Sequence, residues 1–334
     1  MIKFAIEAEK GGFTATMTSD HFHPWWHDNG YGNFTWVWLA AAAERTKKMK
    51  FLTGVTAPVY RYNPAIIAQA FASLDVLYPG RIGLGLGTGE AMNEVSVGFD
   101  WPPVDVRLKR TIEAIQIIKK LWNNKEDNKQ TQAGEQRQST ENEGFVNFKG
   151  DYFKTKDAKL YTPPSTNIPL FLAASGPDAT RTAARYTDGV ITISKPEKVK
   201  EMFDIFDKTA LEEGRDPQNL QKIGKPKISY SEDYDKAFKS SEFWRAGDLD
   251  DVFNTDINDP RKLQQKAKLE VSDEKLKEST FIVTSIEDLI KPLEDYFAAG
   301  FTQVYLHSTS PDEMEFVQKF CSKVLPHFGD GTVK

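Results

Sequence analysis

Three of the chain's five histidines lie close together, at His21, His23 and His27, beside Asp20 and Trp25. A neutral imidazole accepts a proton near neutral pH, and a neighbouring carboxylate can orient its ring. We therefore interpret Asp20, His21 and Trp25 as candidates for proton transfer. The alternative is a loop whose polar side chains only make hydrogen bonds.

The pair His21 and His23 also resembles the metal-binding pair that follows a strand in barrel hydrolases. Such a site needs further ligands from later strand ends. The sequence provides only His307 there, because His327 lies in a terminal helical stretch. We expect no bound metal, and a barrel metallohydrolase is the weaker alternative.

A second stretch that could carry chemistry is the glycine-rich run at residues 83–90. Its alternating glycines lack the G-x-G-x-x-G spacing of a dinucleotide-binding turn, and no acidic residue follows at the distance that motif requires. Glycines also let a flat ring or another backbone approach a strand closely. Glu90 then ends the strand as a second acid–base candidate or, alternatively, as a charge at the start of a helix.

A third stretch, Ser175-Gly176-Pro177, precedes a predicted helix. Free N–H groups and the helix dipole at such a position could hold a phosphate. A simple N-cap with proline just inside the helix explains the same residues. Both readings stay open.

These candidates need elements to position them, and the chain alternates strands with helices. We expect strands at residues 13–18, 51–56, 81–86, 169–174, 189–192, 227–230 and 302–307, and helices at 1–10, 36–48, 65–77, 106–122, 178–186, 198–213 and 286–299. The alternation predicts a parallel α/β fold, and a TIM-type (β/α)₈ barrel needs eight strands. Because the chain opens on a helix, the first barrel strand would precede Met1, or the sheet does not close.

Three segments interrupt the alternation. Residues 123–144 are almost wholly polar and cannot bury enough apolar surface to offset their ordering entropy, so we expect a mobile insertion. A hairpin is expected around Lys149-Gly150, and residues 231–279 are predicted to be charged and helical. We expect a single barrel domain over residues 1–334.

Composition limits the classes of partner. The formal net charge of -5 argues against nucleic acid, which would need a basic face. A single cysteine, Cys321, excludes a disulfide framework and indicates a reducing compartment. There is neither an apolar run of membrane-spanning length nor a signal peptide, so we expect a soluble cytoplasmic protein with no membrane partner.

Three motifs together resemble the coenzyme F420-dependent dehydrogenases of the luciferase-like superfamily. They are Ser-Asp-His-Phe-His-Pro-Trp at 19–25, Tyr-Arg-Tyr-Asn-Pro-Ala at 60–65 and Gly-Thr-Gly-Glu-Ala-Met-Asn-Glu at 87–94. The resemblance covers nearly the whole chain. It implies a homodimeric barrel with the deazaflavin cofactor in the mouth formed by the carboxyl ends of the strands. An FMN-dependent monooxygenase of the same fold is the alternative.

The resemblance also implies a role for individual residues. His21 is then the catalytic base, Trp25 flanks the reacting centre and Glu90 is an acid near the ring. The implied cofactor contacts are Asp20, a cis peptide bond between Gly54 and Val55, Thr88, Asn93, and Ser175 with Gly176 at the phosphate tail.

The implied substrate is an alcohol or a sugar phosphate. Sugar-phosphate members of the family bind the phosphate with two lysines and an arginine. The matching positions here hold Asn254, Thr280 and either Pro196 or, with a one-residue gap, Lys195. Because two cationic partners are lost, we expect a neutral alcohol rather than glucose 6-phosphate.

Overall fold

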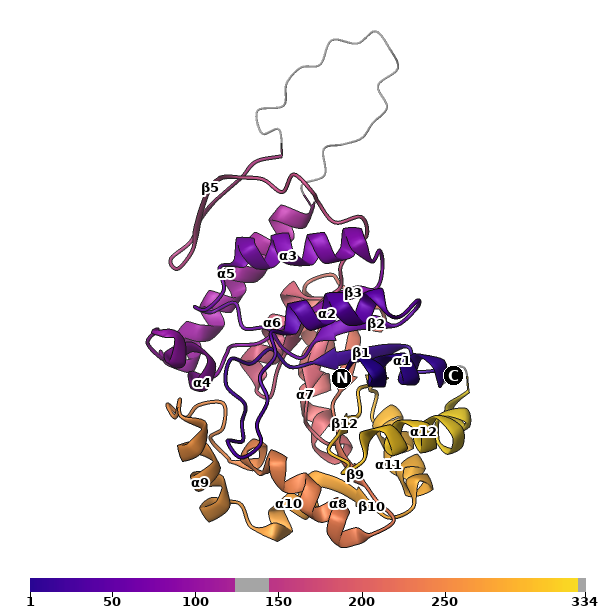
Figure 1. Ribbon diagram of the computed structural model, residues 1–334. Coiled ribbons are helices and arrows are strands. Elements are labelled where there is room, and N and C mark those ends of the chain that lie inside the picture. The colour runs from indigo at the N-terminus through magenta and orange to yellow at the C-terminus, as the bar shows by residue number, and fades with distance from the viewer. Residues whose placement is uncertain (124–143, 330–334) are drawn as a thin grey trace.

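The computed structural model describes residues 1–123 and 144–329 (Figure 1). The predicted insertion at 123–144 lies outside the described residues, apart from its two end positions. Among the helices described, none combines the length and the apolar character that crossing a membrane requires.

Seven strands form one sheet in the order β1-β2-β3-β6-β7-β8-β11, and every ladder in it is parallel. These strands are β1 (Ala15–Thr18), β2 (Lys50–Thr53), β3 (Ile82–Leu86), β6 (Leu170–Ala173), β7 (Gly189–Thr192), β8 (Gln221–Gly224) and β11 (Gln303–Val304). Their carboxyl ends share one edge, which we call the barrel mouth.

A second parallel sheet extends the wall beyond β8. Two residues after β8 the chain enters β9 (Lys227–Tyr230), which pairs with β10 (Thr280–Val283) on one side and β12 (His307–Ser308) on the other. The parallel strands thus curl into a half-barrel of the TIM type. Within the described residues no ladder joins β1 to β11.

Helices flank and connect the strands of both sheets along the chain (Figure 1). They are α1 (Ile2–Lys10), α2 (Thr35–Glu44), α3 (Pro64–Leu77), α4 (Ala91–Glu94), α5 (Val104–Asn123), α6 (Pro177–Tyr186), α7 (Pro196–Glu212), α8 (Tyr234–Ser241), α9 (Pro260–Glu270), α10 (Asp273–Ser279), α11 (Ile290–Ala298) and α12 (Glu313–Lys323). The first turn of α3 shows why a helix begins here. The Asn63 side chain accepts from the Ala65 N–H, and Pro64 has no N–H that would need an acceptor. The expected hairpin consists of β4 (Val146–Lys149) and β5 (Lys154–Ala158).

The sequence prediction missed two strands, β8 and β10, and it predicted the last strand as one piece where the structure has β11 and β12. The four residues of β8 include one large apolar side chain, Ile223, so no apolar run marks the strand. β10 begins directly after α10, with no turn residue between them.

The helical segment after β9 packs against the loop that follows β1. Trp26 of that loop and Met92 of α4 share a buried apolar cluster with Ala246, Leu249 and Leu263. In Figure 1 the orange helices α8, α9 and α10 lie together, at the end of the view away from α3. This lobe therefore supports the loop that carries the histidines.

Candidate active site

The His loop (residues 19–28) leaves the end of β1 and is anchored by Asp20. The Asp20 side chain is 2% exposed. Its carboxylate accepts from Thr56 Oγ1 at 2.8 Å, from Tyr62 OH at 3.2 Å and from Arg61 Nη2 at 3.3 Å. Because the loop after β2 supplies all three donors, Asp20 fixes the His loop against it.

The centre of the candidate site is one carboxylate oxygen, Glu90 Oε2. It accepts from Trp25 Nε1 at 2.8 Å and from Asn93 Nδ2 at 3.1 Å, and it lies 3.5 Å from His21 Nδ1. The side chains of His21 and Glu90 are 20% and 16% exposed. The arrangement is a partly accessible imidazole–carboxylate pair, which can take or deliver a proton.

Asn93 connects this pair to the backbone of the His loop. Its Oδ1 accepts from the N–H of Phe22 at 2.7 Å and from the N–H of His23 at 3.3 Å, while its Nδ2 donates to Glu90. The side chain is 4% exposed. Asn93 therefore sets the position of both the loop and Glu90.

Glycines in β3 and the loop after it bring that loop close to β2. A Cβ on Gly85 would lie 2.1 Å from the Thr53 carbonyl oxygen, and one on Gly87 would lie 2.5 Å from Val55 Cγ2. The peptide bond between Gly54 and Val55 is cis. The structure thus brings residues 54–55 close to residues 87–90. These two segments contain the predicted cofactor contacts Gly54, Val55 and Thr88.

Arg107 in the first turns of α5 holds the other side of the glycine loop. The side chain is 1% exposed. It donates to the carbonyls of Thr88 at 3.5 Å and Phe253 at 3.2 Å, and to Asn254 Oδ1 at 3.2 Å. Thr88 and Asn254, which sequence reasoning assigned to cofactor and substrate, are therefore linked through one buried arginine.

Ser175 and Gly176 lie at the mouth, where β6 leads into α6. No side chain caps this ten-residue helix, and a Cβ on Gly176 would meet nothing within 4 Å. Open N–H groups at a helix start fit an anionic phosphate. The residues present therefore fit the phosphate tail of the cofactor.

The predicted substrate residues Lys195 and Thr280 lie at the junction of α10 and β10, where Thr280 is the first residue of the strand. Lys195 Nζ donates to the Glu278 carbonyl. Thr280 is buried, with its Oγ1 3.4 Å from Ser279 Oγ. Lys227, the register partner of Thr280, binds both carboxylate oxygens of Asp248 at 2.6 Å.

Sequence reasoning gave no role to two further groups near Glu90. Glu94 is fully buried, and desolvation raises its pKa to about 7 although the Arg61 N–H donates to it at 2.7 Å. Lys225, between β8 and β9, has its pKa lowered to about 8 by desolvation, against the attraction of Glu90. Glu94 and Arg61 lie inside the recognised motifs, whereas no pattern marks Lys225.

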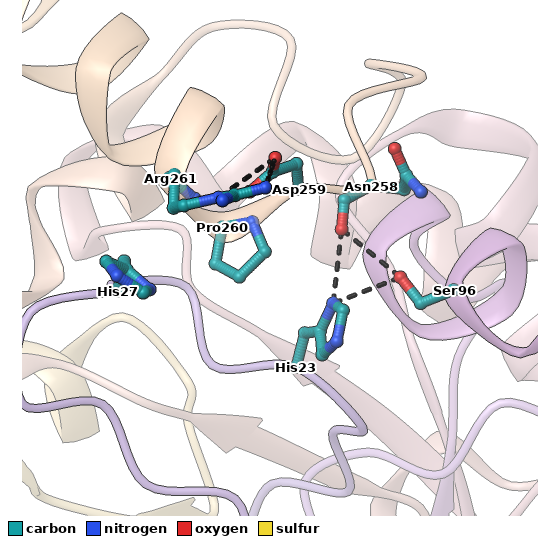
Figure 2. Close-up of a pocket in the computed structure, with 7 residues that line it drawn as sticks. All are labelled: His23, His27, Ser96, Asn258, Asp259, Pro260 and Arg261. Carbon is teal, nitrogen blue, oxygen red and sulfur yellow. Dashed lines mark hydrogen bonds and ion pairs between the residues drawn. The ribbon is translucent and has the colours of Figure 1, made fainter.

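His23 and His27 lie away from this centre, at a hollow of about 430 Å³ next to the start of α9. Figure 2 shows its lining residues: His23, His27, Ser96, Asn258, Asp259, Pro260 and Arg261. His23 Nδ1 lies 3.0 Å from Ser96 Oγ and 3.2 Å from the Asn258 carbonyl. His21 and His23 thus have different partners, and among residues 1–123 and 144–329 no three His, Cys, Asp or Glu side chains are grouped to hold a metal ion.

Comparisons with known proteins show to which family the chain belongs. The chain matches the family model described as luciferase-like monooxygenase over residues 1–303. It is 34% identical over 329 residues to the F420-dependent glucose-6-phosphate dehydrogenase of Microbacterium testaceum (strain StLB037), across 98% of this chain and 92% of that protein. It is 34% identical over 333 residues to F420-dependent glucose-6-phosphate dehydrogenase 2 of Rhodococcus jostii (strain RHA1), again across 98% and 92%.

Two solved structures have the same fold as this chain. An F420-dependent secondary alcohol dehydrogenase in complex with an F420-acetone adduct has a TM-score of 0.88 and 36% identity, over 97% of this chain and 93% of that one. The coenzyme F420-dependent tetrahydromethanopterin reductase from Methanopyrus kandleri shares the fold, with a TM-score of 0.72 at 22% identity over 98% of this chain and 94% of that one. The chain therefore belongs to the luciferase-like family, and its relatives at 34% and 36% identity are named F420-dependent dehydrogenases.

Proposed function

We propose that the chain is a coenzyme F420-dependent dehydrogenase acting on a CH–OH donor. The observation that carries this is the pair formed by His21 Nδ1 and Glu90 Oε2, 3.5 Å apart at the barrel mouth. Relatives at 34% and 36% identity with F420-dependent activities in their names support it. When bound, the cofactor supplies a ring carbon that exchanges hydride with the alcohol carbon.

His21 is the proposed base. Its Nδ1 faces Glu90, so a proton from a substrate hydroxyl is expected on Nε2, and Glu90 stabilises the imidazolium that results. Trp25 covers the pair from one side and donates to Glu90, which keeps the carboxylate in place. The proposed cofactor contacts are the 54–55 and 87–93 segments and the open start of α6, which would hold the phosphate.

Replacing His21 tests this role. We expect His21→Ala to lower turnover roughly 10²–10⁴-fold, the usual range for loss of a general base, while leaving F420 affinity nearly unchanged. Turnover is measured from the loss of oxidised F420 absorbance, and affinity from quenching of its fluorescence. A change in turnover below about threefold, with binding intact, removes His21 from the chemistry.

For the substrate we propose a small alcohol rather than a sugar phosphate. Asn254 accepts from Arg107, and Thr280 is neutral and buried, so neither position presents a free cation. Lys195 is engaged by the Glu278 carbonyl. A phosphate dianion would have to find its charged partners elsewhere.

We also propose a homodimer in the cytoplasm. A groove of about 330 Å³ runs between α2 and α3 and is lined mainly by apolar side chains. Around it Phe34, Val37 and Leu77 are 51%, 67% and 65% exposed. Contiguous exposed apolar surface of this kind is typical of protein–protein contact, and a second copy is the occupant that the family resemblance suggests. The single free cysteine supports the reducing compartment.

A further inference from the structure

Lys225, at the joint between β8 and β9, reaches across the barrel mouth. Its Nζ lies 3.4 Å from Ser19 Oγ and 3.5 Å from the Gly54 carbonyl, at the ends of β1 and β2. Both distances are long for an ammonium donor, and neither acceptor is charged. The contacts place the charge at the mouth without neutralising it.

Two neighbouring lysines, in contrast, have carboxylate partners. Lys227 Nζ is bound by Asp248 at 2.6 Å, and Lys222 Nζ by Asp207 at 2.7 Å. In the part of the chain that the structure describes, no carboxylate oxygen lies within 4.0 Å of Lys225 Nζ. An ammonium that is partly removed from water and has no counter-ion is unfavourable, so we expect it to be paired with an anion from outside the chain.

The groups around Lys225 do not supply that partner. Glu90 attracts it from the loop after β3, yet desolvation still lowers its pKa to about 8, so it is positive at neutral pH. His307 on β12 is held neutral, because burial and the charges of Lys225 and Lys227 lower its pKa. Lys225 keeps intermediate exposure and so remains accessible from the mouth.

The same wall continues to the proposed reacting centre. The His307 ring packs edge-on against Trp244 with centroids 4.2 Å apart, and Trp244 meets Trp25 at 6.3 Å. Trp25 in turn donates to Glu90. Lys225 interacts electrostatically with both Glu90 and His307, so an anionic group bound by Lys225 would lie between them, next to the proposed reacting centre.

We propose that Lys225 binds a carboxylate of the substrate next to its alcohol carbon, so that the substrate is a hydroxy acid. This rests on the proposed function. The single charge of Lys225 suits a monoanion; Lys227 nearby is bound by Asp248, and Lys195 Nζ donates to the Glu278 carbonyl. In the reaction the hydroxyl gives its proton to His21 and its carbon gives hydride to the cofactor, which leaves an oxo acid with the carboxylate unchanged.

Isobutyrate and isobutyramide test this. They have nearly the same shape, differ in charge, and have no hydroxyl to react. With the F420-bound protein we expect isobutyrate to bind roughly 10- to 100-fold more tightly, the contribution of one charge-assisted hydrogen bond. Lys225→Met should abolish that preference and Lys225→Arg should retain part of it.

A matched control is Lys119→Met, because burial also lowers the pKa of Lys119, which donates to the Tyr186 carbonyl from α5. This variant should keep the preference for isobutyrate. Thermal unfolding of the ligand-free protein separates a binding role from a structural one. Removing an uncompensated cation should raise the Tm in Lys225→Met, whereas removing a structural lysine lowers it.

Equal affinity of wild-type protein for the two probes overturns the proposal. So does a Lys225→Met variant that keeps the preference and changes only the pH profile, which would make Lys225 a counter-charge for Glu90. Binding of isobutyrate and isobutyramide is also measured without cofactor, from the shift that each causes in the Tm of the protein. Failure to bind F420 would therefore sink the proposed function and still leave the carboxylate preference measurable.

Discussion

At the scale of single residues, two carboxylates near each other have different environments. Glu90 accepts two hydrogen bonds on one oxygen and is partly exposed. Glu94, four residues on, is fully buried; one oxygen accepts from Arg61 N and the other has no partner among the described residues. The mouth therefore holds an accessible carboxylate backed by one that favours its neutral form.

Glu94 gives a prediction about pH. Its folded pKa, about 7, exceeds the ordinary 4.5, so its contribution to stability is complete below pH 4.5 and is lost as pH rises through 7. The loss amounts to roughly 3 kcal/mol. Glu94→Gln keeps the acceptor for Arg61 but cannot ionise.

Urea unfolding at pH 5 and pH 8 measures this. Between the two pH values, wild-type protein should lose roughly 2.5 kcal/mol of unfolding free energy relative to Glu94→Gln. Parallel pH profiles for the two proteins would show that Glu94 ionises normally in the folded state.

At the scale of elements, Arg107 ties three segments together. It donates to the Pro102 carbonyl at 3.2 Å as well as to Thr88, Phe253 and Asn254, and it lies over the Trp101 ring at 4.1 Å. We expect Arg107→Met to lower the unfolding free energy by roughly 2–4 kcal/mol, because several buried acceptors lose their donor.

Lys109→Met is the control on the same helix. Its exposed 3.4 Å ion pair with Asp105 should contribute less than about 1 kcal/mol. Chemical denaturation of both variants measures this difference. Equal midpoints for the two variants would mean that the hydrogen bonds of Arg107 do not stabilise the contact between these segments.

The elements also show what the sequence could predict. The strands at 189–192 and 227–230 were predicted with the bounds they have, because short apolar and β-branched runs end at turn residues. His21 and Glu90 were expected at one mouth because each follows a strand, although β8, with its single large apolar residue, was missed. Arg107 and Lys225 could not be predicted, because a charged residue normally indicates a solvent-exposed position. Only tertiary packing buries Arg107 and brings Lys225 to the barrel mouth.

At the scale of the whole molecule, the apolar groove between α2 and α3 predicts self-association. We expect the protein to sediment with the mass of two chains and Val37→Glu to sediment as one, because a charge there would be desolvated in the contact. Leu269→Glu on α9, an equally apolar residue that is 80% exposed, is the matched control and should remain dimeric. A monomeric wild-type protein contradicts the proposal.

The half-barrel and the lobe of α8 to α10 hold the His loop between them at the barrel mouth. We propose that hydride is exchanged with F420 there. The most direct measurement mixes the protein with oxidised F420 or with FMN and follows the loss of visible absorbance after adding a small secondary alcohol, a hydroxy acid or glucose 6-phosphate. We predict that F420 is bound and reduced by an alcohol, with glucose 6-phosphate inferior to the best small alcohol. Tight binding of FMN without binding of F420, or F420 that no alcohol reduces, would contradict the proposed function.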